Sequence, residues 1–175
     1  MKTLARLVLP LSLSLAACSA GAPSNPAPAA IASDAAASEA PADAFLAALR
    51  QHCGQAFEGR IVADQPPPEG PDPFTGKALV MHVRDCAPNE VRVPFHVGED
   101  RSRTWVITRT GEGLRLKHDH RHEDGSPDPV TMYGGDTDGP GTVRRQSFPV
   151  DAESVAMFGR EGLKASVQNT WAMEV

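Results

Sequence analysis

The sequence has little of what most recognisable classes of function need. Aromatic residues make up only 5% of its 175 residues, and no dense run of lysine and arginine is present. Nucleic-acid binding usually depends on such a run, so the composition argues against that class of partner. Neither the nucleophile motif GxSxG nor the zinc motif HExxH occurs, and no two cysteines have CxxC spacing. The commonest signatures of hydrolases and of metal sites are therefore missing.

The amino terminus, by contrast, carries the pattern of an exported protein. Lys2 and Arg6 precede an apolar stretch over residues 7–17, which is shorter than the roughly 20 residues of a membrane-spanning helix. The stretch runs into LAAC, whose last residue is Cys18, and these four letters resemble the lipobox of bacterial lipoproteins. The resemblance implies a signal peptide over residues 1–17 and acylation of Cys18, with palmitate among the acyl groups.

The residues after this cysteine predict where the protein is held. Ser19, not aspartate, follows Cys18, and in lipoproteins of Gram-negative bacteria this implies the periplasmic face of the outer membrane. If the lipobox is not used, the chain is secreted instead. Alanine, proline and serine fill 18 of the 23 positions of residues 19–41, which leaves too little apolar surface to offset the entropy of ordering. We therefore expect a disordered tether over residues 18–42 and one domain over residues 43–175.

The net charge of the chain affects its electrostatic attraction to a membrane. The full sequence has 17 basic and 22 acidic residues, a formal net charge of −5. Loss of Lys2 and Arg6 with the signal peptide leaves 15 against 22, or −7. Because anionic membranes attract basic segments, we expect the lipid alone to hold this acidic protein at the membrane.

The sequence contains three cysteines. If Cys18 is acylated, Cys53 and Cys86 remain as an even pair in an oxidising compartment, and we expect them to form a disulfide. Closing a loop of that length contributes on the order of 3–4 kcal/mol in the chain-entropy model. A reactive or metal-binding pair is the alternative, and the spacing of the two residues does not favour it.

Most of the domain has the alternation and turn residues of short strands. Phe45, Leu46 and Leu49 share one face of a predicted helix over 41–54, and a second short helix is expected over 151–160. Clusters of Gly, Pro, Asn and Asp separate eight expected strands: 57–63, 77–84, 90–97, 103–109, 113–122, 129–134, 141–148 and 163–174. The pattern predicts a mainly β fold, a single antiparallel up-and-down β-barrel of about eight strands with an N-terminal helix. A β-sandwich is the alternative.

The apolar alternation also predicts the register of three strands. If the turn at 110–113 brings Ile107 opposite Leu116, then Trp105 lies opposite His118 and Arg103 opposite His120. The next turn places Thr131 opposite His120 and Tyr133 opposite His118. The other face of the histidine strand carries only charged residues, which we expect to point to water: Arg115, Lys117, Asp119, Arg121 and Glu123. The histidines must then face the interior.

This inward face suggests a ligand pocket at the mouth of the barrel. Small barrels hold one ligand in such a cup, and an arginine beside a histidine favours a small anionic ligand. The predicted ligand-binding residues are Arg103, Trp105, His118, His120, Thr131 and Tyr133. An interior in which these side chains satisfy one another is the competing interpretation.

Two other chemistries can be drawn from the same residues. His118 and His120, two apart on a strand, are spaced to share one zinc ion, but no third ligand is evident beside them. Ser102 or Ser126 could join a histidine and either Asp119 or Asp128 in a hydrolytic set, although nothing in the local sequence marks a nucleophile. The sequence leaves enzymatic activity open and favours a protein without one.

The run from Val91 to Thr137, which includes VRVPFHVGEDRSRTW and LKHDHRHEDG, resembles a group of uncharacterised bacterial secreted proteins and lipoproteins. That group implies no activity. The order of a helix followed by a strand meander also resembles the calycin and lipocalin barrels, without a clear GxW motif near the first strand. We expect a lipid-anchored envelope protein that binds a small ligand. A non-catalytic interaction or structural module and a histidine-based metal-binding protein are the alternatives.

Overall fold

A computed structural model describes residues 39–65, 70 and 72–175. The predicted signal peptide, the predicted acylation site at Cys18 and most of the predicted tether lie outside the described residues. Among the helices of the described part, none combines the length and the apolar character that crossing a bilayer would require.

The described chain is mainly β. Its helices are α1 (Pro41–Arg50), α2 (Ala152–Arg160) and the short 3₁₀ helix η1 (Lys164–Gln168). Its strands are β1 (Ala56–Gly59), β2 (Leu79–His82), β3 (Asp85–Cys86), β4 (Glu90–Val97), β5 (Asp100–Arg109), β6 (Leu114–His120), β7 (Tyr133–Asp136), β8 (Arg145–Pro149) and β9 (Thr170–Glu174).

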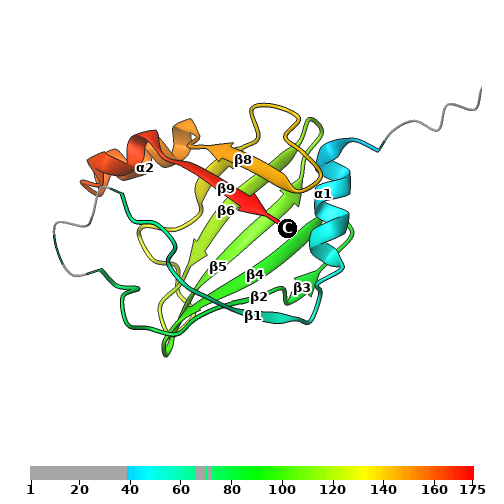
Figure 1. The fold of residues 1–175 in the computed structure, drawn as a ribbon. Helices are drawn as coiled ribbons and strands as arrows, with labels where there is room; N and C mark the ends of the chain where they lie inside the picture. The colour runs from blue at the N-terminus through cyan, green and yellow to red at the C-terminus, as the bar shows by residue number, and fades with distance from the viewer. Residues whose placement is uncertain (1–38, 66–69, 71) are drawn as a thin grey trace, which may run out of the picture. The chain divides into compact units, whose positions relative to one another are not determined.

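Seven strands form one antiparallel sheet in the order β1-β2-β4-β5-β6-β7, with β3 paired to β4, and β8 and β9 form a separate two-stranded sheet (Figure 1). β8 contacts β7, so the two-stranded β8–β9 sheet lies against the large sheet without sharing a hydrogen-bond ladder with it. Within the described residues no ladder links β9 or β7 to β1. The mainly β prediction is confirmed, and the predicted closed barrel is not found.

Helix α1 covers one end of the concave face of the sheet. Pro41 stands in its first turn, and Phe45, Leu46 and Leu49 form its buried face, as the spacing predicts. They pack with residues of β4, β5, β6 and β8: Val91, Val93, Ile107, Leu114, Leu116 and Phe148. The helix ends at Arg50, earlier than expected, because a turn over residues 51–54 leads to Gly54 at φ +83°.

The two predicted partner cysteines meet just beyond this helix. Cys53 Sγ and Cys86 Sγ are 2.16 Å apart, at disulfide distance, with a Cα–Cα separation of 6.3 Å. Cys53 lies in the turn after α1 and Cys86 lies in β3. The pair therefore ties the carboxyl end of α1 to the sheet.

The register predicted for the central strands is confirmed. Trp105 pairs with His118, Arg103 with His120, and Ile107 with Leu116. Tyr133 of β7 lies opposite His118, also as expected. The bounds 129–134 expected for this strand are wrong. Met132 at φ +53° bends the chain, so the ladder of β7 starts only at Tyr133.

A glycine pair explains why β7 continues past Tyr133. Gly134 and Gly135 look like turn residues in the sequence, but both lie in the strand. A Cβ on Gly135 would stand 1.7 Å from the carbonyl oxygen of Pro149, and one on Gly134 would stand 1.9 Å from that of Leu116. The glycines are needed because neighbouring backbone lies directly on the strand.

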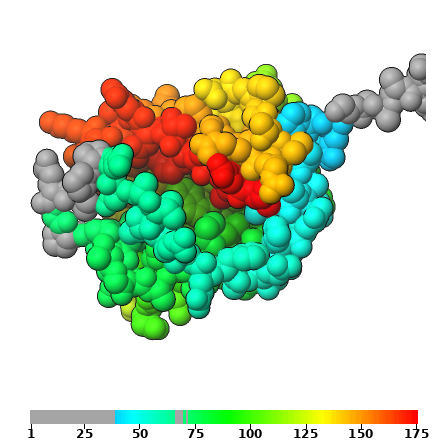
Figure 2. Space-filling model, in the orientation of Figure 1, coloured from blue at the N-terminus to red at the C-terminus, as the bar shows by residue number. Residues whose placement is uncertain are grey.

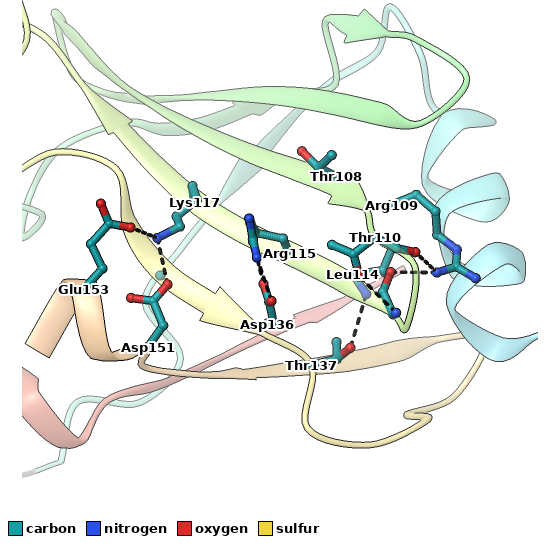
Figure 3. Close-up of polar contacts among 12 residues, drawn as sticks. Thr108, Arg109, Thr110, Leu114, Arg115, Lys117, Asp136, Thr137, Asp151 and Glu153 are labelled. Atoms are coloured by element: carbon teal, nitrogen blue, oxygen red, sulfur yellow. Dashed lines mark hydrogen bonds and ion pairs between the residues drawn. The ribbon is translucent and has the colours of Figure 1, made fainter.

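The expectation that the charged face of β6 points to water is wrong for two residues near the middle of the strand. Lys117 and Asp119 are only 9% and 7% exposed. Lys117 Nζ lies 2.7 Å from Asp151 Oδ2 and 3.5 Å from Glu153 Oε2, as Figure 3 shows. Since Asp151 caps α2 by accepting a hydrogen bond from the Ser154 N–H, the start of this helix covers Lys117. Asp119 is covered by its own partners, Arg121 and Arg92.

Because of the ion pair between Lys117 and Asp151, substitution of Lys117 should cost more stability than substitution of a surface lysine. Burial alone would raise the pKa of the Asp151 carboxyl, but hydrogen bonds from Lys117 and Ser154 outweigh it and hold that pKa below its usual value. We expect Lys117→Ala to lower the free energy of unfolding by about 2 kcal/mol, because it leaves Asp151 partly buried without its cation. Urea unfolding measures the loss. The matched change at exposed Lys164 should cost under about 0.5 kcal/mol, and an equal effect of both changes would refute the structural role of Lys117.

Candidate functional site

The predicted pocket residues do come together, but as packed rings. The ring centroid of His118 is 4.6 Å from that of Trp105 and 4.6 Å from that of Tyr133, stacked on the latter. Phe158 of α2 and Trp171 of β9 close over Tyr133 at 5.3 and 5.6 Å. Aromatic groups at these separations are in direct contact. The interior beneath the histidines is therefore filled by side chains from β5, β6, β7, β9 and α2.

His118 is held neutral by this packing. It is 2% exposed, and burial is the main cause that lowers its pKa from 6.5 to about 4, with smaller contributions from His120 and Arg103. Its Nδ1 is buried and has no hydrogen-bond partner among the described residues. Burial likewise raises the pKa of Tyr133. Both groups are in their uncharged forms at neutral pH, because burial disfavours the charged form of each.

His120 belongs to a polar cluster at the end of the same strand. Its Nε2 is 2.9 Å from Ser102 Oγ, its Nδ1 is 3.7 Å from Asp128 Oδ1, and its backbone N–H donates to Thr131 Oγ1 at 2.8 Å. The Asp128 oxygen also accepts the N–H of Val130 at 2.7 Å. The histidine–aspartate distance exceeds that of a hydrogen bond, so the continuous chain of a Ser-His-Asp nucleophile is not formed here. The other serine considered, Ser126, bonds to Asp124.

Arg103, the expected anion-binding residue, already has a carboxylate partner. Its guanidinium donates to Asp100 and lies over the Phe74 ring at 6.0 Å. Burial would raise the pKa of the Asp100 carboxyl, but hydrogen bonds from Ser102 and Arg103 hold it far below its usual value. The two charges compensate each other, which leaves little attraction for an added anion.

A hollow of about 600 Å³ opens beside this cluster. Ser102 and His122 lie in its wall with two arginines and three carboxylates: Arg101, Arg121, Glu99, Asp100 and Glu123. Among the described residues, no three His, Cys, Asp or Glu side chains are grouped so that they could hold a metal ion. A ligand or a zinc ion at the histidine end stays a prediction, because the hollow there is lined by charged and polar side chains and not by the packed rings.

A different recess is lined mainly by apolar side chains. One hollow of about 350 Å³ lies over β1, β2 and β4, with Phe57, Ile61, Phe74, Leu79, Met81 and Phe95 among its lining. A second, of about 260 Å³, shares Phe57 and Met81 with it and reaches β9 and the end of α1. It adds Leu49, His52, Val83, Val93, Met173, Glu174 and Val175. We call the two together the β1–β9 trough.

The trough is open to solvent between its two bordering strands. Figure 2 shows the recess between the segment around β1 and the C-terminal strand β9. Phe57 and Ile61 are 44% and 43% exposed although they belong to an apolar surface. The sequence alone does not indicate this site, because the site depends on which strands fail to pair. The exposure of β1, with all four of its residues at the surface, marks it.

Together, fold and site define a mainly β domain with a filled histidine end and an open apolar trough. Comparison of the chain with protein-family models, with curated proteins and with solved structures gives no match. The likeness of Val91–Thr137 to bacterial lipoproteins and the architectural likeness to lipocalins therefore stay predictions.

Proposed function

We propose that this protein is a non-catalytic binding module of the bacterial cell envelope, held at a membrane by lipid on Cys18, whose binding surface is the β1–β9 trough. In this proposal the large sheet and the two-stranded β8–β9 sheet act as one incomplete barrel, and the trough is the gap in its wall. The histidine end is the other candidate for a ligand-binding or structural role, and fewer observations favour it than favour the trough.

The observation that carries the proposal is the contrast between the two ends of the concave face. At the histidine end, the rings of Trp105, His118 and Tyr133 fill the interior, and the hollow beside them is lined by charged and polar side chains. In the trough, Phe57 and Ile61 leave large apolar groups partly in water. An exposed apolar recess is costly for a soluble domain and usually marks a binding surface.

The membrane anchor follows from the lipobox resemblance at Leu15–Cys18. In a Gram-negative host, labelled palmitate is expected to enter the full chain and to be absent from Cys18→Ser. The unlabelled variant should also be absent from the outer-membrane fraction, because the acidic domain offers no basic patch for lipid headgroups. Equal labelling of both chains would remove the anchor from the proposal.

The trough can be tested with the uncharged fluorophore N-phenyl-1-naphthylamine, which brightens in apolar sites. We expect saturable, one-to-one binding by the full chain carrying Cys18→Ser, which keeps acyl chains out of the measurement. Phe57→Glu should weaken binding at least about tenfold, since it places a charge in the apolar recess. Val143→Glu, which introduces the same charge at a 50% exposed residue outside the trough, should bind normally. Binding lost in His120→Ala but kept in Phe57→Glu would contradict the proposal.

A further inference from the structure

Both walls of the trough are edge strands. Within the described residues, β1 pairs only with β2, and β9 pairs only with β8. In an antiparallel pair, alternate residues direct their backbone N–H and C=O groups away from the partner strand. Each wall therefore presents unpaired backbone donors and acceptors along one side, and such an edge readily accepts another strand.

The burial of the side chains along β9 shows which face of this strand lies on the apolar interior. Trp171 and Met173 of β9, and Val175 directly after it, are half-buried toward the sheet, whereas Ala172 and Glu174 between them are exposed. This period of two is that of a strand with one face on an apolar surface. The neighbouring trough offers the same surface to a further strand, because Met81, Val83 and Val93 continue its floor toward β1.

The free edges distinguish between possible occupants. A wholly apolar molecule, such as an acyl chain, would cover backbone groups of β1 and β9 without bonding to them, at a cost of about 1–3 kcal/mol for each group removed from water. An extended polypeptide bonds to those groups and places every second side chain on the apolar floor. Strand addition of this kind combines backbone bonds for affinity with alternate side chains for specificity.

The charges at the rim do not select the sign of charge of such a segment. Glu174 on β9 is exposed at the border of the trough but is already paired with Arg145, and Arg60 lies beside Glu58 on β1. Recognition therefore depends on the backbone edges and on the apolar floor.

Building on the proposed function, we propose that the occupant of the β1–β9 trough is an extended segment of another polypeptide, which pairs as an added strand with the free edge of one or both walls. Its inward positions carry large apolar side chains at every second residue. Four residues of β1 and five of β9 are available for pairing, so the recognised core spans about 13–17 Å at roughly 3.3 Å per residue.

The test selects partners from a displayed library of random twelve-residue peptides, using the full chain with Cys18→Ser. The expected peptides have apolar residues at alternate positions and bind with micromolar dissociation constants. Binding should fall at least about tenfold in Phe57→Glu and be unchanged in Val143→Glu. N-methylation of alternate peptide residues on the bonding edge should abolish it, because it removes the backbone donors while leaving the side chains in place.

Each other result overturns the inference. Selected peptides without alternation, peptides that bind Phe57→Glu normally, or N-methylated peptides that bind as well as the parent would show that no strand is added. So would a failure to select any peptide. If N-phenyl-1-naphthylamine still binds in those cases, the trough remains an apolar site and only the strand inference fails; if it does not bind either, the proposed function fails too. A concentration-dependent dimer that disappears in Phe57→Glu would instead identify the occupant as a second copy of the chain.

Discussion

Gly135→Ala is expected to destabilise the domain by about 3 kcal/mol or more, a fall in melting temperature on the order of 10 °C. The added Cβ would lie 1.7 Å from the Pro149 oxygen and 2.9 Å from the Pro149 carbonyl carbon. Both atoms are backbone, so no flexible side chain can move aside. The Asp151 N–H, which donates to Gly134 at 2.9 Å, fixes the same chain segment against β7.

Gly139→Ala is the matched control for this change. It lies four residues further along the chain, and a Cβ there meets nothing within 4 Å. Its substitution should leave the melting temperature unchanged or slightly higher, since alanine reduces the entropy of the unfolded chain. Calorimetry of the wild type, Gly135→Ala and Gly139→Ala measures the three melting temperatures. Equal melting temperatures for wild type and Gly135→Ala would show that β8 does not lie on β7 as described.

The second large effect is a loss of stability in mild acid that depends on His118. The folded-state pKa of this residue is lowered to about 4 from 6.5, so between these values the unfolded chain binds more protons than the folded one. The contribution of His118 is then fully present above pH 6.5 and is lost as the pH falls toward 4. Its size is about 3 kcal/mol, from roughly 1.4 kcal/mol per pKa unit.

The measurement is the free energy of unfolding in urea at pH 7.0, 5.5 and 4.5. In His118→Phe, which keeps an aromatic ring between Trp105 and Tyr133, most of the loss between pH 6.5 and 4.5 should disappear. A smaller slope should remain, because burial also lowers the pKa of His96. The exposed His122, changed to glutamine, should leave the profile as in the wild type. A profile that is the same in His118→Phe would mean that the histidine is not buried neutral.

The central hairpins were predictable because their determinants are local. The alternation of Trp105 and Ile107 with Leu114 and Leu116, together with the turn at 110–113, fixes the register of β5 and β6 in a single way. The inward direction of His118 follows from the same register. Sequence reasoning succeeds here because each strand contacts its neighbour in the chain.

The errors concern contacts between segments far apart in the sequence. Lys117 looks like a surface residue until Asp151, 34 residues later, covers it. Gly135 looks like a turn residue until the backbone at Pro149 comes to lie on it. The trough has no local signal at all, since Phe57 and Met173 have the ordinary alternation of strand residues. Only the failure of β1 and β9 to pair leaves these side chains at the edge of an open recess.

The most direct test of the trough as binding surface is hydrogen–deuterium exchange of the full chain with Cys18→Ser, with and without saturating N-phenyl-1-naphthylamine. We expect slower exchange in residues 55–61 and 170–175, which border the trough, and no change in residues 99–102 and 118–128 at the histidine end. Protection confined to 99–102 and 118–128 would contradict it, and would return the binding site to Arg103, His118 and His120.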